Sequence, residues 1–275
     1  MLLAIDIGNT NIVFGIFTDR RLAVSLRLAT WPDRTADELW VVVSQLLAGR
    51  QVAIDGIDGV VLSSVVPALT RTVAEMVEQG LGREALQVDA RNAGLPVRYD
   101  NPEDVGADRL VNGVAASALY GAPSRPVIVV DFGTATTFDA ISPRHGYLGG
   151  VICPGVDISA DALFQRAARL PRVEVSRPPE LIGRTTEASM QAGLFFGHVA
   201  MVEGIVGRLR DELRDEGEAV CVATGGLAGA IAAETAVIDK VNPDLTLTGL
   251  QLVWERNSAG PAPGARNASA GGRGR

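Results

Sequence analysis

The chain has 275 residues, 47% of them hydrophobic and 21% charged, which supplies enough apolar side chains for one large core or two small ones. Its 25 Lys and Arg residues against 32 Asp and Glu residues give a formal net charge of −7. Such a balance provides no basic field for nucleic acid or anionic lipid, so we expect no nucleic-acid partner.

The N-terminal residues are expected to form a strand and not a signal peptide. No basic region precedes Leu2–Ile7, and Asp6 lies inside this run, whereas a secretory signal has a basic start and an apolar centre. No uninterrupted apolar stretch reaches the roughly 18 residues that a membrane helix needs. We therefore expect a cytoplasmic protein without a membrane partner.

The first elements in chain order are predicted to be an antiparallel meander, with strands at residues 2–7, 12–17 and 22–28 separated by turn-forming residues. Thr35 and Glu38 have the spacing of a capping box, and the apolar residues that follow at helical spacing predict a helix of about four turns. A strand at 60–66, a helix at 68–78 that Gly80 ends, and a helix at 107–120 continue an α/β pattern.

The pattern then begins again. Residues 127–132 predict a buried strand, and Asp131-Phe132-Gly133-Thr134 aligns with Asp6-Ile7-Gly8-Asn9 at an offset of 125 residues. A repeat of domain size indicates an internal duplication with a ligand-binding cleft between two related domains. We place these domains at residues 1–120 and 121–257.

The second half is predicted to contain helices at residues 159–169, 186–216 and 227–234 and a strand at 219–223. Residues 258–275 consist almost entirely of Gly, Ala, Pro, Ser, Asn and Arg without apolar periodicity. Such a segment cannot bury enough apolar surface to offset its ordering entropy, so we expect a disordered tail.

Each copy of the repeat carries Asp-x-Gly and then small hydroxyl or amide residues between two strands. Glycine lets the backbone approach an anion, N–H and hydroxyl groups bind phosphate, and the Asp supplies charge for a cation. One such loop is also an ordinary hairpin turn, but two copies one domain apart favour phosphate binding. A third turn, Thr224-Gly225-Gly226, suits either nucleotide binding or a tight strand-to-helix connection.

These residues resemble the actin and hexokinase superfamily, which implies two ribonuclease-H-like domains. Within it, the chain resembles the type III pantothenate kinases over about residues 1–257. The resemblance is carried by Asp6-Ile7-Gly8-Asn9-Thr10-Asn11, by residues 99–109 with Gly-Ala-Asp-Arg at 106–109, and by residues 131–137. It implies ATP-dependent phosphorylation of pantothenate to 4'-phosphopantothenate, the first step of coenzyme A biosynthesis.

The resemblance also implies roles for individual residues. ATP, with Mg²⁺ held by Asp6 through water, is expected to bind Thr134 and the first loop, which comprises Asp6, Ile7, Gly8, Asn9, Thr10, Asn11, Ile12 and Val13. Asp131 is the expected ligand of a monovalent cation, potassium or ammonium. The expected pantothenate contacts are Tyr99, Gly106, Ala107, Asp108, Arg109 and, across a homodimer interface, Thr186.

Asp108 is the expected proton acceptor for the pantothenate hydroxyl. Its place in the first turn of a helix is expected to lower its pKa and keep it ionised. Without the resemblance, an Asp at this position is more often a residue that complements a helix N-terminus than a base, and Arg109 could be a surface ion-pair residue.

Two other functions stay open at this point. Twin Asp-x-Gly loops also serve sugar and acyl-group kinases of the same superfamily. A non-catalytic regulatory relative is the second alternative. The presence of three carboxylates, Asp6, Asp108 and Asp131, and the run at 101–109 favour the pantothenate kinase.

Overall fold

The computed structural model describes residues 1–121, 123–167 and 169–258, which form two β-sheets of the same design. The first sheet contains β1 (Leu2–Ile7), β2 (Asn11–Thr18), β3 (Arg21–Ala29), β4 (Gly59–Ser64) and β5 (Ala85–Gln87). The second contains β6 (Val127–Phe132), β7 (Ala135–Ser142), β8 (Gly146–Pro154), β9 (Val220–Gly225) and β10 (Lys240–Val241). Their orders, β3-β2-β1-β4-β5 and β8-β7-β6-β9-β10, confirm the predicted duplication.

Both sheets also share the direction of their strands. The first three strands of each pair antiparallel, and the last two add in parallel on the other side of the first strand. A parallel neighbour needs a crossover connection, and helices provide it here. The predicted α/β fold with two ribonuclease-H-like halves is therefore confirmed.

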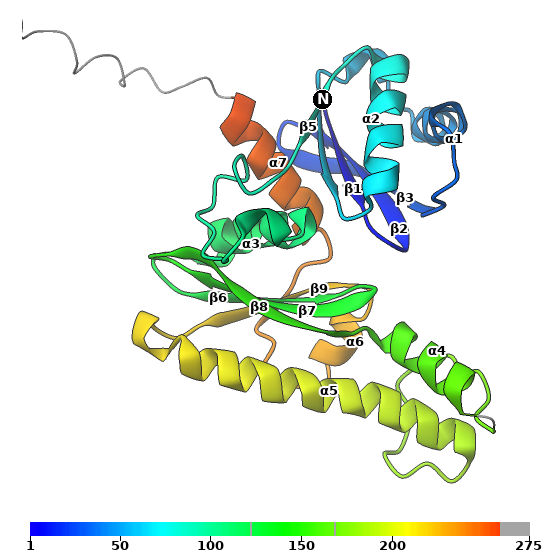
Figure 1. Ribbon diagram of the computed structural model, residues 1–275, viewed down its shortest axis with the longest axis vertical. Helices are drawn as coiled ribbons and strands as arrows, with labels where there is room; N and C mark the ends of the chain where they lie inside the picture. The colour runs from blue at the N-terminus through cyan, green and yellow to red at the C-terminus, as the bar shows by residue number, and fades with distance from the viewer. Residues whose placement is uncertain (122, 168, 259–275) are drawn as a thin grey trace, which may run out of the picture.

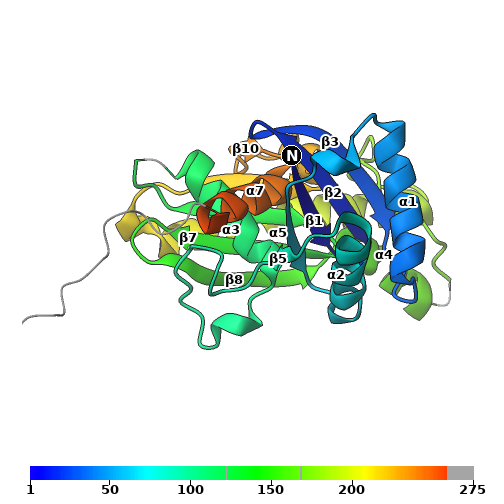
Figure 2. The same cartoon turned by 90° about the horizontal axis from the view of Figure 1, so that it is seen from above.

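Helices form three layers around the two sheets (Figures 1 and 2). The described helices are α1 (Ala36–Gly49), α2 (Pro67–Leu81), α3 (Ala107–Tyr120), α4 (Val156–Arg166), α5 (Thr186–Glu212), α6 (Ala228–Ala232) and α7 (Leu245–Ser258), with 3₁₀ turns η1 (Ile54–Gly56), η2 (Pro102–Asp104) and η3 (Arg214–Glu216). Helices α1 and α2 cover the outer face of the first sheet, and α5 and α6 cover the outer face of the second. Helices α3 and α7 lie between the sheets.

Local sequence signals explain where the early helices begin and end. The capping box of α1 is formed as predicted, because Glu38 N donates to Thr35 Oγ1 and Thr35 N donates to Glu38 Oε2. Helix α2 ends at Gly82, whose φ of 62° favours glycine, and not at Gly80. Gly80 instead lets Trp40 of α1 approach, since a Cβ there would lie 2.3 Å from the indole ring.

Several later elements differ from the prediction. Helix α4 begins at Val156, three residues before the predicted start, and the long helix α5 ends at Glu212 with η3 after it. Strand β8 and helix α7 were not predicted. Helix α7 includes Ser258, the first residue of the predicted tail, and the rest of that tail, 259–275, lies outside the described residues.

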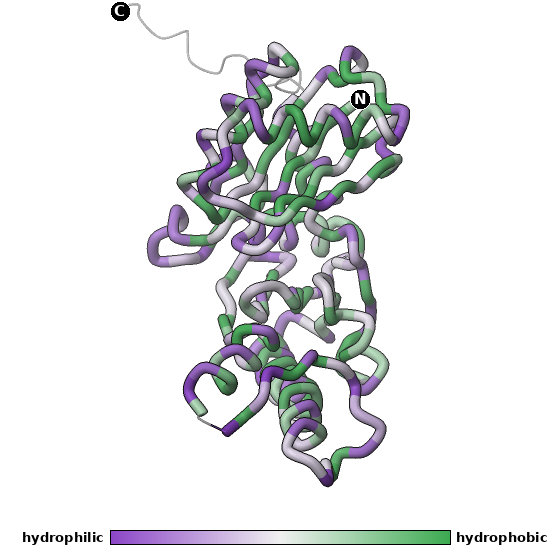
Figure 3. Tube along the Cα trace, turned by 90° about the vertical axis from the view of Figure 1, so that its right-hand side faces the viewer, coloured by the Kyte–Doolittle hydropathy of each residue, from purple (hydrophilic) through white to green (hydrophobic). Residues whose placement is uncertain are grey.

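Helices α3 and α7 pack against each other and each covers the sheet of the other half. Helix α3, from the first half of the chain, contacts β6 and β7 and also β4, whereas α7, from the second half, contacts β1 and β4. Figure 3 shows the resulting two lobes, with apolar residues along the strands. The division at residues 120 and 121 stays a prediction, and we propose that the two helices are exchanged between the halves.

Replacing Gly249 by Ala is expected to destabilise the protein by about 1–3 kcal/mol, because the added methyl group overpacks the contact between α7 and α3. A Cβ on Gly249 would lie only 2.0 Å from the backbone oxygen of Val111. Gly204→Ala, at an exposed position of helix α5 where nothing lies within 4 Å of the new Cβ, is the control and should keep or slightly raise Tm. Equal Tm values for the two variants would contradict the close packing of these helices.

Helix α5 is long and apolar enough to cross a membrane by length and composition, with a mean hydropathy of 1.3 over 18 residues. Its face nevertheless packs in the core of the second half, where Phe195, Val199, Val202 and Val206 are buried against β6 and β7 residues. A core helix passes the same test of length and hydropathy, so these two properties are weak support for a membrane span.

Candidate functional site

Two short loops, residues 8–10 after β1 and residues 133–134 after β6, meet between the halves of the molecule. Thr10 Oγ1 lies 2.7 Å from Thr134 Oγ1, although 124 residues separate the two in the chain. The structure thus brings the two predicted phosphate loops into direct contact.

Hydrogen bonds within the first loop and from Thr30, the residue that follows β3, fix the conformation of the first loop. Gly8 N donates to Asn11 O (2.9 Å), which closes the turn, and Thr30 N donates to Thr10 O (2.9 Å). Thr30 Oγ1 also donates to Gly8 O (2.7 Å). Asn9 and Thr10 remain exposed, so their polar groups are available to a ligand.

Asp6 and Asp131 lie at equivalent positions near the ends of β1 and β6. Ser63 Oγ of the neighbouring strand β4 donates to Asp6 Oδ1 (2.7 Å). Asn112 Nδ2 of α3 donates to Asp131 Oδ2 (3.0 Å), and Thr246 Oγ1 of α7 donates to Asn112 Oδ1 (2.8 Å). Residues from other elements therefore fix the orientation of both carboxylates.

The predicted Thr224-Gly225-Gly226 turn lies beside the second loop. Gly225 has φ +89°, a conformation that favours glycine. A Cβ on Gly225 would lie 2.7 Å from Asp131 Oδ1 and 2.5 Å from Phe132 O. Glycine at this position therefore lets strand β9 end close to the Asp131 carboxylate.

Asp108 is the second residue of α3 and follows, two residues later, the glycine that precedes this helix. Its Oδ1 accepts a hydrogen bond from Arg109 N (2.7 Å). A Cβ on Gly106 would lie 2.5 Å from the same oxygen, so the absence of a side chain on Gly106 makes room for the carboxylate. The Gly-Ala-Asp-Arg run thus shapes the start of α3 around Asp108.

The three carboxylates are half-buried and lie close enough for their charges to interact. Burial raises the pKa of Asp6 to about 7, Ser63 opposes this, and the charge of Asp108 adds to it. Burial, and then the charges of Asp108 and Asp6, raise the pKa of Asp131 to about 7. Burial also raises the pKa of Asp108, although the backbone N–H of Arg109 acts in the opposite direction. The expectation of a lowered Asp108 pKa is therefore wrong, because lost hydration outweighs the helix terminus.

Such mutual repulsion is relieved when cations bind, since a bound cation is often the largest charge in its site. Among the residues that the structure describes, no group of three or more His, Cys, Asp or Glu could hold a metal ion alone. Mg²⁺ usually keeps several waters and binds through one or two carboxylates plus substrate phosphates. The single carboxylate of Asp6, which lies just before the first loop, fits that mode of binding.

Not every residue of the predicted ATP loop offers its side chain to a ligand. Ile7 and Ile12 are buried in the core under α1 and α2. Val13 is half-buried and packs against the core between the sheets. At these positions only the backbone is left to contact a nucleotide.

The sequence motifs do not identify Arg27, which lies on the same face of the first sheet as Asp6. Asp6 pairs with Val13 of β2, Val13 pairs with Arg27 of β3, and directly paired residues share a face. After burial, the positive charge of Arg27 is one of the smaller effects on the pKa of Asp6, which it lowers. Only the strand register, which the sequence does not show, reveals this cation.

The predicted substrate contacts fall into two groups. Tyr99 is half-buried, Ala107 is buried, and Arg109 is buried in an ion pair with Asp139, so its interpretation as a surface ion-pair residue is wrong. Thr186 is exposed at the first position of α5. None of the hydrogen bonds in the described ranges joins its side chain to the other predicted contacts.

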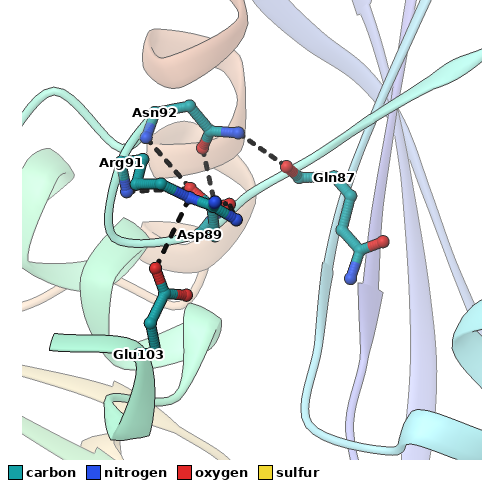
Figure 4. A network of polar contacts seen from close by, with 5 residues as sticks. All are labelled: Gln87, Asp89, Arg91, Asn92 and Glu103. Carbon is teal, nitrogen blue, oxygen red and sulfur yellow. Dashed lines mark hydrogen bonds and ion pairs between the residues drawn. The ribbon is translucent and has the colours of Figure 1, made fainter. Parts of the chain in front are cut away.

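A polar network orders the chain between β5 and α3 (Figure 4). Asp89 Oδ1 accepts from the backbone N–H groups of Arg91 (2.8 Å) and Asn92 (3.1 Å), and Asn92 Nδ2 donates to Gln87 O (2.7 Å). Arg91 Nε also lies 3.4 Å from Glu103 Oε1 in η2. Because η2 leads directly into α3, this network helps to fix the approach to Asp108.

Two sheets of this order, each with a polar loop after its first strand, form the two ribonuclease-H-like halves of an actin-like fold. Two solved structures share it. A protein from Campylobacter jejuni described as a Baf family transcriptional activator matches with a TM-score of 0.59 at 19% identity, covering 93% of this chain and 98% of its own. A protein from Sinorhizobium meliloti described as a 2-dehydro-3-deoxygalactonokinase matches with a TM-score of 0.59 at 11% identity, covering 94% and 99%.

Sequence similarity identifies the family. The model of the type III pantothenate kinase family matches residues 2–208. The type III pantothenate kinases of Moorella thermoacetica and Syntrophotalea carbinolica are 53% and 49% identical to this chain, covering 94% of it and 100% and 99% of their own lengths. The chain belongs to the type III pantothenate kinase family. It is thus a kinase of a family whose reaction is the ATP-dependent phosphorylation of pantothenate in coenzyme A biosynthesis.

Proposed function

We propose that this protein phosphorylates pantothenate at the point where the two loops meet, with Asp108 as the catalytic residue. The observations that carry this proposal are the proximity of Asp6, Asp108 and Asp131, which come from three separate elements and whose charges interact, and the contact of the two loops at Thr10 and Thr134. Phosphoryl transfer mainly requires positioning, charge neutralisation and a group that accepts or orients the proton of the attacking hydroxyl. The site offers a residue for each requirement.

In the proposed step, the pantothenate hydroxyl oxygen forms a bond to the γ-phosphorus of ATP. The bond from that phosphorus to the bridging β–γ oxygen breaks, and ADP leaves with the electron pair. The hydroxyl proton passes to the Asp108 carboxylate. Burial raises the pKa of Asp108 and so strengthens it as a base.

The two loops are proposed to bind the ATP phosphates, through the exposed groups of Asn9 and Thr10 and through Thr134. Asp6 would hold Mg²⁺ through water, and the ion would neutralise charge on the ATP phosphates. Arg27 is positioned to add positive charge on the same face of the sheet. Neutralisation by these groups lowers the repulsion that opposes attack on the triphosphate.

Asp131 is proposed to bind potassium or ammonium. Replacing sodium by either ion should then raise the rate, because the ion offsets the charge of the phosphates and of Asp131 itself. Asp131→Ala should remove the difference between the salts, which steady-state rates in matched chloride salts will measure. Asp161→Ala, at an exposed carboxylate of α4, is the control. Equal rates of the wild-type protein in all three salts would rule out the site.

Pantothenate is proposed to contact Tyr99 and the start of α3, from Gly106 to Arg109. Gly106 and Ala107 present backbone at the helix N-terminus, where N–H groups lack helical partners. Arg109 carries the positive charge that a carboxylate substrate requires. Thr186 is proposed to contribute from a second copy of the chain.

A homodimer is proposed because apolar side chains are exposed at one end of the second half. Ile152 of edge strand β8 is 61% exposed, and Ile182, shortly before α5, is 78% exposed. Helix α4 adds Phe164 at the same end of the molecule. Exposed apolar patches of this kind mark protein interfaces.

Phe164→Glu should shift the protein toward the monomer, because it places a charge in the proposed apolar interface. Light scattering measures the mass, and an unchanged mass would contradict the interface.

We also propose that the protein acts in the cytoplasm without nucleic-acid or membrane partners. The net charge of −7 and the packed face of α5 support this proposal.

The deciding experiment measures ADP release with pantothenate, with sugars and without acceptor. ADP release that depends on pantothenate is the expected result. Release with a sugar but not with pantothenate would support a sugar kinase, and no release with any acceptor would support a regulatory protein.

A further inference from the structure

A buried polar triad lies directly behind the proposed substrate contacts. We propose that Asp139 and Tyr147 are positioning residues that hold the Arg109 guanidinium in one orientation, toward the carboxylate of pantothenate. This inference rests on the proposed role of Arg109 in substrate binding.

The triad converges on one oxygen atom. Asp139, on β7, is fully buried, and its Oδ1 lies 2.8 Å from Arg109 Nε and 2.7 Å from Arg109 Nη2. Tyr147 Oη of β8 donates to the same oxygen at 2.7 Å. Burial and the nearby Asp139 raise the pKa of Tyr147, so its hydroxyl stays protonated and donates. The Arg109 guanidinium is therefore held at Nε by a hydrogen bond to Asp139, with Nη2 at ion-pair distance from the same oxygen.

Arg109 keeps hydrogen-bonding capacity that the described residues do not use. Its side chain is only 8% exposed, yet Nη2 makes no well-directed hydrogen bond within the described ranges despite its short distance to Asp139. A buried donor without an acceptor is costly, so native structures supply one from protein, water or ligand. A substrate carboxylate would supply two acceptor oxygens in the planar geometry that a guanidinium fits.

The lack of a side chain on Gly150 lets this nitrogen pack closely against strand β8. A Cβ on Gly150 would lie 2.9 Å from Arg109 Nη2, and a Cβ on Gly149 would lie 3.6 Å from the Tyr99 ring. The Tyr147 ring lies 5.8 Å from the Arg109 guanidinium carbon and 6.4 Å from the Tyr99 ring. The Arg109 guanidinium, the glycine pair and Tyr99 thus lie together, and Asp139 and Tyr147 are hydrogen-bonded to each other behind the guanidinium.

Asp139 itself is unsuited to touch the substrate. It is inaccessible to solvent, and a second carboxylate placed beside it would be repelled. Its effect on pantothenate is therefore exerted through Arg109. Removing its charge would free the guanidinium to rotate away from the substrate, and removing only the Tyr147 hydroxyl would loosen the same arrangement less.

The test compares two variants, Asp139→Asn and Tyr147→Phe. The control is Tyr120→Phe, which removes the hydroxyl of a tyrosine at the end of α3; this hydroxyl is hydrogen-bonded to Asn242 and not to the triad. A charge-assisted hydrogen bond of ordinary strength predicts a KM for pantothenate about 10- to 100-fold higher in Asp139→Asn, and a smaller rise of about threefold in Tyr147→Phe. The KM for ATP should stay within about twofold in every variant, and Tyr120→Phe should match the wild-type protein. Calorimetric binding of pantothenate provides a readout without turnover.

A folded Asp139→Asn variant with unchanged KM for pantothenate would overturn the inference. So would a loss confined to kcat, because Arg109 would then act on the moving phosphoryl group. If Asp139→Asn does not fold, Tyr147→Phe decides, since it keeps the ring and removes one hydrogen bond. A wild-type protein that releases no ADP with pantothenate would defeat the proposed function, a result distinct from these.

Discussion

Asp108→Asn is expected to lower kcat by a factor of about 10² or more, because general-base assistance typically contributes 10² to 10⁴ in rate. Asn keeps the shape of the side chain and its place over Gly106, but it cannot accept the hydroxyl proton. In the wild-type protein kcat should rise with pH as the Asp108 carboxyl, whose pKa burial raises, loses its proton. A pH profile of kcat for both forms measures the effect.

ATP binding, followed by calorimetry, should change little in this variant, since the phosphates are assigned to the two loops. Asp104→Asn is the matched control, because Asp104 is an exposed carboxylate of η2 that accepts from Asn101 (2.8 Å). If the carboxylate only orients the hydroxyl, as a loose transition state permits, the loss will be smaller and nearly independent of pH. A fully active Asn variant would leave Asp108 with a purely structural role at the helix start.

Asp131→Asn is expected to raise Tm by several degrees at pH 8 in buffer without potassium, ammonium, Mg²⁺ or nucleotide. The pKa of Asp131 is about 7 in the folded protein, against an ordinary value of 3.8. The folded state therefore binds the extra proton between these values, and stability falls as pH rises from about 4 to about 7. Asn carries no charge, so the stability of the variant does not fall over this pH range. The variant also loses the proposed cation ligand.

Thermal unfolding at pH 5 and pH 8 measures this difference. The gain from Asp131→Asn should shrink at pH 5, where the wild-type carboxyl is largely protonated. Asp161→Asn, at an exposed carboxylate paired with Arg172 (3.2 Å), should give equal Tm shifts at both pH values. A gain for Asp131→Asn that is the same at both values would show that its burial costs no free energy.

The sequence predicts the repeated architecture well because its signals are local. Asp-x-Gly between apolar runs and the capping box of Thr35 and Glu38 each depend on a few neighbouring residues. Helix α7 is not predicted, because its local sequence carries no strong helix signal. Thr246, Thr248 and Gly249 lower its intrinsic helix propensity, and tertiary packing between the sheets stabilises it instead.

The sequence likewise predicts only some residues of the candidate site. The loop residues and Asp108 follow from motifs, whereas Asn112 and Asp139 act through partners 19 and 30 residues away in the chain, and Tyr147 acts through Asp139. The sign of the Asp108 pKa shift also depends on burial, which the position in a helix does not reveal. Strand register and side-chain burial are thus what the sequence lacks.

The placement of α7 on the first sheet has a consequence for synthesis on the ribosome. The first five strands emerge early, but the apolar face formed by Leu2, Ala4 and Val61 is covered by a helix made near the end of translation. Until then this face is open to other nascent chains, since transiently exposed apolar surface promotes aggregation. We therefore expect chaperones to bind the unfinished chain, and fragments that stop before Leu245 to be insoluble.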